Sequence, residues 1–235
     1  CAIVRINFND PKWGRSASGA LAFVKKNGYS RLLLVPELVE SPSEEVFAPM
    51  RKAVSSFVQK AASKGIKVLV EDFDNPFSLC GNTALVDALL EAVPSLGFLF
   101  DTGNFLPSGE DAYRQLLHFG PRVAYVHLKD RVSGNDLSCT PAGAGCLPIR
   151  AMIKRLAAIG YDGWFCVEQF GSADMLADAS SSYAVVHESL GDPAMTAPLT
   201  EYYYPEVPVV DASLYVPSPE IPQGAEVLFD GSNLD

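Results

Sequence analysis

Four short apolar runs of the sequence each lead into a side chain that can bind a metal ion. The runs at residues 67–70, 97–100, 123–126 and 164–167 are followed by Glu71, Asp101, His127 and Glu168. Three carboxylates and one imidazole form an oxygen-rich donor set that suits Mn²⁺, Co²⁺, Mg²⁺ or Zn²⁺. If the four side chains converge, the sequence predicts a site for one divalent metal ion.

Convergence requires the four runs to be neighbouring parallel strands. A run of about four apolar residues between turn signals is typical of a strand that is buried on both faces. We expect strands at 3–8, 31–35, 67–70, 97–100, 123–127 and 164–168, alternating with helices at 17–27, 43–63, 83–92, 110–118, 148–158 and 173–190. In such βαβ folds, functional side chains lie at the carboxyl ends of the strands, which is where all four candidates fall.

This alternation predicts an α/β fold, and more specifically a (β/α)₈ TIM barrel that lacks its first two βα units. A closed barrel has eight strands, and only six are expected here. An open doubly wound sheet would need no missing units and is the alternative. Such a sheet gathers its site near one switch point, whereas four successive strands that each supply a ligand favour a ring.

The composition limits the kinds of partner. With 48% hydrophobic and 20% charged residues, the 235-residue chain is typical of a soluble globular protein. Its formal net charge of −10 argues against nucleic acid and anionic membranes, whose binding depends on Lys and Arg. We therefore expect a soluble protein of the cytoplasm or the bacterial periplasm with no nucleic acid or membrane as its partner, and homo-oligomer formation is left open.

Three segments are expected along the chain. Residues 1–190 form the barrel part. Residues 191–226 are rich in Pro and Tyr and are expected to be a linker or a tail packed over a surface. Residues 227–235 become hydrophobic again, as at the start of a second domain. Because the chain begins within a predicted strand and without Met, we expect a fragment or a processed product.

The stretches around the four candidates resemble the xylose isomerase-like TIM-barrel superfamily of sugar phosphate isomerases and epimerases, which includes the endonuclease IV group. The matching stretches are 70–73, 100–105, 126–130, 141–145 and 160–168. In the epimerase branch a Glu, Asp, His and Glu set holds one divalent metal, and the two Glu also move protons. The resemblance therefore implies Glu71, Asp101, His127 and Glu168 as metal ligands, with Glu71 and Glu168 also catalytic.

The resemblance also bears on substrate binding. Asn104 stands where the family often has a His that touches the substrate, and Ala144 stands where it often has an acid. Both departures put the usual substrate in question and leave the metal set intact. We expect Asn104, Lys129 and Glu37 to contact the substrate. Lys129 can stabilise a developing oxyanion or form a salt bridge with Asp130, and the salt bridge is slightly favoured.

Several functions remain in competition. The preferred one is a divalent-metal-dependent isomerase or epimerase of a sugar or keto-sugar, which works by proton transfer through a metal-stabilised enediolate. The same site could serve a lyase acting on 3-keto-glycosides, and residues 227–235 resemble the opening of a 3-keto-disaccharide hydrolase domain. Phosphodiester cleavage is disfavoured, because the chain is acidic and has only three His. A non-catalytic barrel scaffold is the last alternative.

Overall fold

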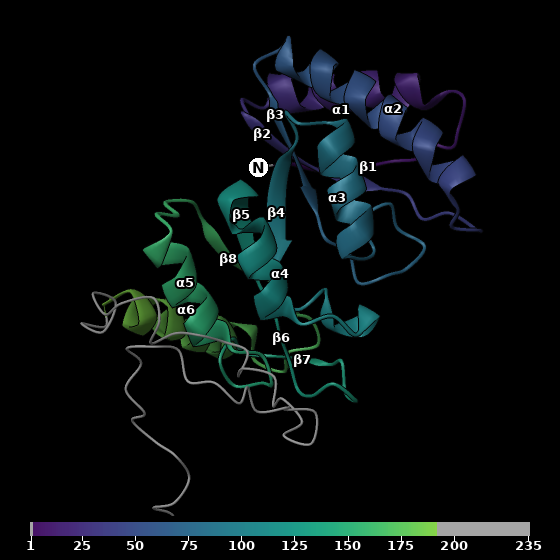
Figure 1. Cartoon of the computed structure of the whole chain (residues 1–235). Helices are drawn as coiled ribbons and strands as arrows, with labels where there is room; N and C mark the ends of the chain where they lie inside the picture. Colours follow the sequence, from purple (N-terminus) through teal and green to yellow (C-terminus); the bar gives the residue numbers. More distant parts are fainter. Residues whose placement is uncertain (1, 192–235) are drawn as a thin grey trace, which may run out of the picture. The chain divides into compact units, whose positions relative to one another are not determined.

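The computed structural model of the chain describes residues 2–191, which belong to the first of its two units, Cys1–Tyr204. Strands and helices alternate in these residues (Figure 1). The main strands are β1 (Ala2–Ile6), β2 (Arg31–Pro36), β3 (Lys67–Glu71), β4 (Gly97–Asp101), β5 (Val123–Leu128) and β8 (Phe165–Val167). The helices are α1 (Trp13–Lys26), α2 (Glu44–Ala62), α3 (Thr83–Ala92), α4 (Ala112–Phe119), α5 (Ile149–Ala158) and α6 (Met175–Gly191).

The six main strands form one parallel sheet in the order β1-β2-β3-β4-β5-β8. This is the order of the strands along the chain, as in a (β/α)₈ barrel, and it lacks the reversal that defines a doubly wound sheet. The predicted barrel class is therefore confirmed, with six of its eight strands. Within the described residues β1 and β8 each have one sheet neighbour, so the sheet does not close on itself there.

The two faces of the sheet have different apolar neighbours. Side chains such as Leu34 and Val70 belong to the large core shared with the helices. Leu33, Leu69 and Leu99 form a separate small cluster. Because successive side chains of a strand point to opposite faces, both faces need apolar residues, which explains the continuous apolar runs.

Two helices that flank β4 begin at side-chain caps. The Asn82 side chain accepts a hydrogen bond from the Leu85 amide at the start of α3. The Asp111 side chain accepts one from the Arg114 amide at the start of α4. Such caps satisfy amide groups that have no partner inside the helix. The helix predicted from residue 110 therefore begins at Ala112, because Asp111 is its cap.

Two parts of the predicted secondary structure were wrong. Helix α1 begins at Trp13 rather than at residue 17. The Trp13 amide donates a hydrogen bond to the Asp10 backbone oxygen at 2.9 Å, and the centre of the Trp13 ring lies 5.4 Å from that of the Phe8 ring, so both contacts hold the first turn in place. The loop after β5 contains a short antiparallel pair, β6 (Asp130–Arg131) with β7 (Cys139–Thr140). Strands of two residues are too short to produce a periodic sequence pattern.

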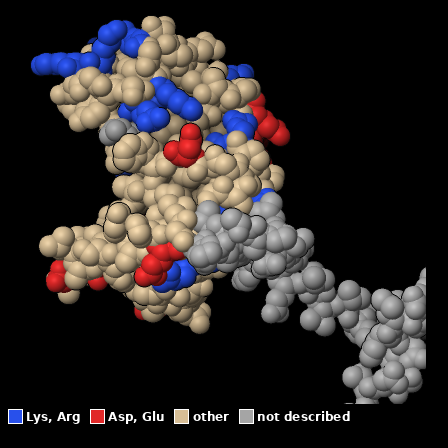
Figure 2. All heavy atoms as spheres, turned by 90° about the vertical axis from the view of Figure 1, so that its left-hand side faces the viewer, with Lys and Arg blue, Asp and Glu red and all other residues tan. Residues whose placement is uncertain are grey.

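The remaining sequence predictions concern the tail and the surface. The expected linker and the expected start of a second domain lie outside the described residues, apart from Gly191 at the end of α6. Among residues 2–191, no helix combines the length and apolarity that a membrane crossing requires. On the face drawn in Figure 2, Lys and Arg side chains gather over the upper part, so the chain's net negative charge is unevenly spread.

Candidate metal centre and substrate pocket

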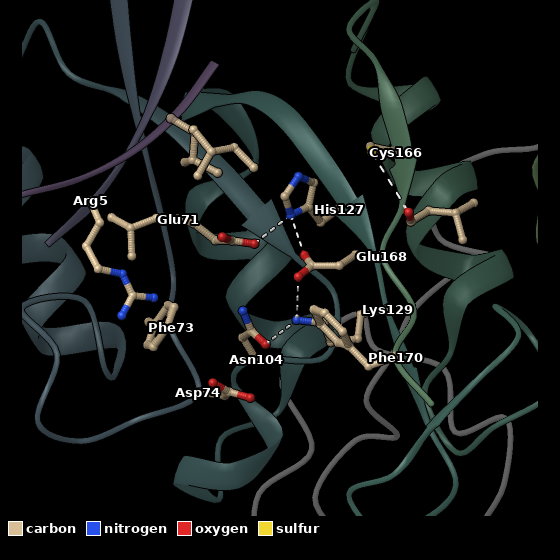
Figure 3. A pocket seen from close by; sticks show the side chains of 14 residues that line it. Arg5, Glu71, Phe73, Asp74, Asn104, His127, Lys129, Cys166, Glu168 and Phe170 are labelled. Carbon is tan, nitrogen blue, oxygen red and sulfur yellow. Dashed lines mark hydrogen bonds and ion pairs between the residues drawn. The ribbon is translucent and has the colours of Figure 1, made fainter. Parts of the chain in front are cut away.

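The four predicted ligands meet at the carboxyl end of the sheet, and Figure 3 shows three of them, Glu71, His127 and Glu168, beside one another. Glu71 and Asp101 are the last residues of β3 and β4. His127 is the register partner of Asp101 in β5, and Glu168 follows β8 directly. Each residue offers one ligand atom, and these atoms all lie within 4.8 Å of one another. The structure thus brings the four side chains together, while cation binding stays a prediction.

His127 links the two glutamates. Its Nδ1 lies 2.7 Å from Glu71 Oε1 and 2.6 Å from Glu168 Oε2. Burial lowers the pKa of His127, but the contacts with Glu168 and Glu71 outweigh burial and raise it to about 10. Burial also raises the pKa of Glu168, but His127 and the charge of Lys129 lower it to about 2. Without a cation, the cluster therefore holds a proton on His127 between two carboxylates.

Asp101 is completely buried, and two neighbours orient it. Its Oδ1 accepts the Gly103 amide at 2.7 Å. Its own amide donates to Asp72 Oδ1 at 2.8 Å, so Asp72 supports the ligand from behind. Burial raises the pKa of Asp101 to about 7, against the opposing charge of Lys129. Burial and the Asp101 charge also raise the pKa of Asp72 well above its ordinary value.

Lys129 belongs to this cluster, and the slightly favoured salt bridge with Asp130 was wrong. Lys129 Nζ lies 3.0 Å from Asp101 Oδ2 and 3.6 Å from Glu168 Oε1. Burial lowers the pKa of Lys129, but the Asp101 and Glu168 charges raise it above its ordinary value. The buried Asp130 carboxylate instead accepts backbone amides, among them Gly143 at 2.9 Å and Gly145 at 3.0 Å. Asp130 therefore fixes the loop before α5.

Two buried oxygens of the cluster, Asp101 Oδ2 and Glu168 Oε2, face the cationic members of the cluster. They lie 3.0 Å from Lys129 Nζ and 2.6 Å from His127 Nδ1 respectively. Buried carboxylates need such opposite charge, because their desolvation is otherwise not compensated. A divalent cation among the four side chains would supply this charge to the three carboxylates, and the imidazole would be its fourth donor. The residues therefore fit a divalent metal ion.

A cavity of about 480 Å³ opens onto the cluster. Asn104 and Lys129 line it, as expected for substrate-binding residues, whereas Glu37 does not and instead lies 3.6 Å from Arg5. The sequence interpretation missed other residues of the lining. They include Arg5, Phe73, Asp74, Cys166 and Phe170. Phe73 and Phe170 follow Glu71 and Glu168 by two positions, so strand alternation continued past the strand ends would have indicated them.

The comparison with protein families agrees with this architecture. The family model of the xylose isomerase-like TIM barrel matches residues 15–186. The chain belongs to this family. The match runs from α1 to α6 and so includes the strand ends that position the cluster. It confirms the resemblance that was inferred from the sequence.

One curated relative matches part of the chain. The inosose dehydratase of Bacillus thuringiensis (strain Al Hakam) is 34% identical over 104 residues, which covers 37% of this chain and 35% of the relative. The chain thus matches about a third of the length of that relative.

Solved structures of related fold have low sequence identity and show the fold alone. The IOLI protein, solved with a bound zinc atom, superposes with a TM-score of 0.67 at 16% identity, covering 86% of this chain and 77% of that one. A D-tagatose 3-epimerase-like protein superposes with a TM-score of 0.61 at 21% identity, covering 80% of this chain and 76% of that one.

Proposed function

We propose that this chain is part of a divalent-metal-dependent isomerase or epimerase that moves a proton at the carbon next to the carbonyl of a sugar or keto-sugar. One observation carries the proposal. Glu71 Oε1 and Glu168 Oε2 lie 2.7 and 2.6 Å from the same atom, His127 Nδ1, in one pocket. Removal of a proton from one face of a carbon and its return from the other requires two acid–base groups around one small volume.

The cation would be held by the four clustered side chains, Glu71, Asp101, His127 and Glu168. A divalent metal ion polarises a carbonyl group and so makes the neighbouring C–H bond more acidic. The zinc atom named for the IOLI structure supports a metal ion in a protein of this fold. Whether this chain takes Mn²⁺, Co²⁺, Mg²⁺ or Zn²⁺ is left to experiment, since carboxylate and imidazole donors accept all four.

We assign the first proton transfer to Glu168. Its side chain is 26% exposed, whereas that of Glu71 is 9% exposed, so Glu168 is the more accessible from the pocket. Glu168 takes the proton from the carbon next to the carbonyl, and Glu71 returns a proton to the opposite face. The result is inversion at that carbon, with no net change in protons or electrons.

Lys129 and Asn104 have separate roles in this proposal. Lys129 donates to the substrate oxygen on which negative charge develops. The Asn104 side chain orients Lys129, because its Oδ1 accepts from Lys129 Nζ at 2.9 Å while its Nδ2 donates to the Asp72 backbone oxygen at 2.9 Å. Glu37 has no direct role in this proposal, since it does not line the pocket and instead lies 3.6 Å from Arg5.

A dehydratase is the second candidate, because the relative with 34% identity is named an inosose dehydratase. Elimination begins with the same transfer of a proton from carbon to Glu168. The electron pair then expels the hydroxyl group of the next carbon, which leaves as water with a proton from Lys129. Lys129 regains its proton from Glu168. With an alcohol as the leaving group, the same steps describe a lyase acting on 3-keto-glycosides.

Solvent exchange tests the common step of these candidates. The chelated full chain is reloaded with Mn²⁺, Co²⁺, Mg²⁺ or Zn²⁺ and incubated in D₂O with ketoses, inososes and 3-keto-glycosides. Mass spectrometry then measures deuterium at the carbon next to the carbonyl. An epimerised product supports the first candidate, and an unsaturated ketone supports the second.

The control is the same Glu→Gln substitution at a glutamate outside the pocket. Glu168→Gln should slow exchange by about 10²–10⁴-fold, while Glu188→Gln, at an exposed ion pair with Arg150 outside the pocket lining, should retain it. If no substrate exchanges deuterium with any of the four metals, the proposed function is wrong.

A further inference from the structure

Arg5 is a charged residue in an otherwise apolar part of the pocket. Along β1, Ala2 and Ile6 are buried in the core shared with the helices, whereas Ile3 and Arg5 line the cavity. The register partners of Ile3 and Arg5 are Leu33 and Val35, which also line it. Three aliphatic side chains therefore line this part of the cavity together with one guanidinium group, which packing alone does not require.

Arg5 and Lys129, the Arg and Lys of the pocket lining, differ in how many protein groups already contact their charged ends. Lys129 Nζ has Asp101, Asn104 and Glu168 within 3.6 Å. Within the described residues, the Arg5 guanidinium lies 3.6 Å from Glu37 Oε1, which is beyond hydrogen-bonding distance. Figure 3 shows the Arg5 side chain entering the pocket from the side of β1. Arg5 is thus the lining cation with donors left for a ligand.

The contact with Glu37 is easily exchanged. The two side chains are 60% and 39% exposed, and an ion pair between such groups contributes little to stability. A planar guanidinium binds an anionic group better, because two of its N–H groups can donate in parallel to two oxygens. An incoming anion would therefore displace Glu37 at small cost.

We infer that the substrate of this pocket carries an anionic group remote from its carbonyl, and that Arg5 binds this group. The inference rests on the proposed function and specifies its substrate class. Arg5 lies on β1 and Glu71 on β3, with β2 between them, so their backbones are about 10 Å apart at the usual spacing of strands. A carbonyl at the cluster thus leaves a small sugar room to extend toward Arg5 within a cavity of about 480 Å³.

Three matched ketoses test the inference by isothermal titration calorimetry on the Mn²⁺-reconstituted full chain. The probes are D-fructose, D-fructuronate, which has a carboxylate at carbon 6, and fructose 6-phosphate. Charge-assisted hydrogen bonds predict about 10- to 100-fold tighter binding of an anionic probe than of fructose. The anionic probe that binds tighter identifies carboxylate or phosphate as the preferred group.

Variants assign the preference to Arg5. Arg5→Gln should reduce the affinity for the anionic probe to that for fructose, and Arg5→Lys should retain part of the preference through a single charged donor group. Glu37→Gln should strengthen anion binding, because it removes the competing carboxylate. Arg15→Gln, which removes the same charge at an exposed position of α1 outside the pocket lining, should leave the preference unchanged.

Three results would overturn the inference: equal binding of all three probes by the unaltered chain, binding of none, or a preference that persists in Arg5→Gln. The last result would mean that the anion binds elsewhere, for example at the metal. Deuterium exchange measured on the same samples reports the proposed function separately. A preference without exchange contradicts the proposed chemistry alone, and exchange without a preference contradicts the role of Arg5 alone.

Discussion

Asp101→Asn is the sharpest test of the metal centre. Asp101 is 0% exposed and supplies one of the three carboxylates of the cluster. The Asn side chain keeps the shape of Asp, and its oxygen can still accept a hydrogen bond from the Gly103 backbone amide, so the chain directly after β4 should keep its conformation. The substitution removes one negative charge from the donor set, and the cation then loses an anionic ligand.

The expected loss can be expressed as a change in thermal stability. Substitution of residues that merely support a ligand typically costs 10- to 100-fold in metal affinity, so we expect about 100-fold or more for the ligand itself. At a Mn²⁺ concentration of about 100 times Kd, binding adds about 2.7 kcal/mol to the free energy of unfolding. After a ~100-fold loss of affinity, the same concentration adds about 0.4 kcal/mol.

The assay compares Tm with Mn²⁺ and after chelation for each variant, which cancels the change that the substitution itself makes in the metal-free chain. About 2–4 °C per kcal/mol gives a metal-induced rise of ~5–11 °C for the unaltered chain and ~1–2 °C for Asp101→Asn. Asp72→Asn should lose less, because its remaining oxygen can still accept the Asp101 amide. A full metal-induced rise in Asp101→Asn, or a larger loss in Asp72→Asn, would refute the assignment of Asp101 as a ligand.

Three further predictions concern catalysis, packing and capping. Glu168→Gln should slow deuterium exchange in a reactive ketose by about 10²–10⁴-fold with far-UV circular dichroism unchanged, and unaltered exchange would exclude Glu168 as the base. Gly145→Ala should lower the free energy of unfolding in urea by about 1–3 kcal/mol, because the new methyl group would meet the Arg131 backbone oxygen and the Asp130 carboxylate; Gly134→Ala, which has open space, is the control. Asn82→Ala should lose about 1 kcal/mol in the same assay through the α3 cap, and no loss would show that the cap is unimportant.

The sequence predicted the convergence of the cluster because of where its residues stand in their strands. Glu71, Asp101 and His127 end strongly apolar runs, and parallel strands in chain order bring such ends to one edge. Position within the run was therefore enough to select Glu71 and Asp101 from the 28 Asp and Glu residues of the chain, and His127 from its three His residues. The supporting contact from Asp72 was not predictable in this way, because it depends on the distance between two neighbouring loops.

Arg5 and Glu37 show how local sequence misled the choice of substrate-binding residues. Glu37 follows strand β2, which ends at Pro36, and the sequence prediction placed it in contact with the substrate. Its amide donates to the Ile6 backbone oxygen at 3.0 Å, and its side chain lies beside Arg5. Ile3 and Arg5 are two positions apart in β1 and therefore share one face of the strand. In a strand of only five residues, the sequence alone does not tell which face is turned toward the helices and which toward the pocket, so Arg5 was missed.

The position of Lys129 shows that the alternation of side chains along a strand can decide which partner a charged residue has. Lys129 and Asp130 are adjacent, which suggested an ion pair, but adjacent side chains of an extended chain point to opposite faces. His127 and Lys129 are two positions apart and therefore share a face, so both reach the carboxylates of the cluster. Asp130 on the other face meets the backbone amides of Gly143 and Gly145. A Lys two positions after a strand-end ligand should therefore be assigned to the site before it is assigned to its sequence neighbour.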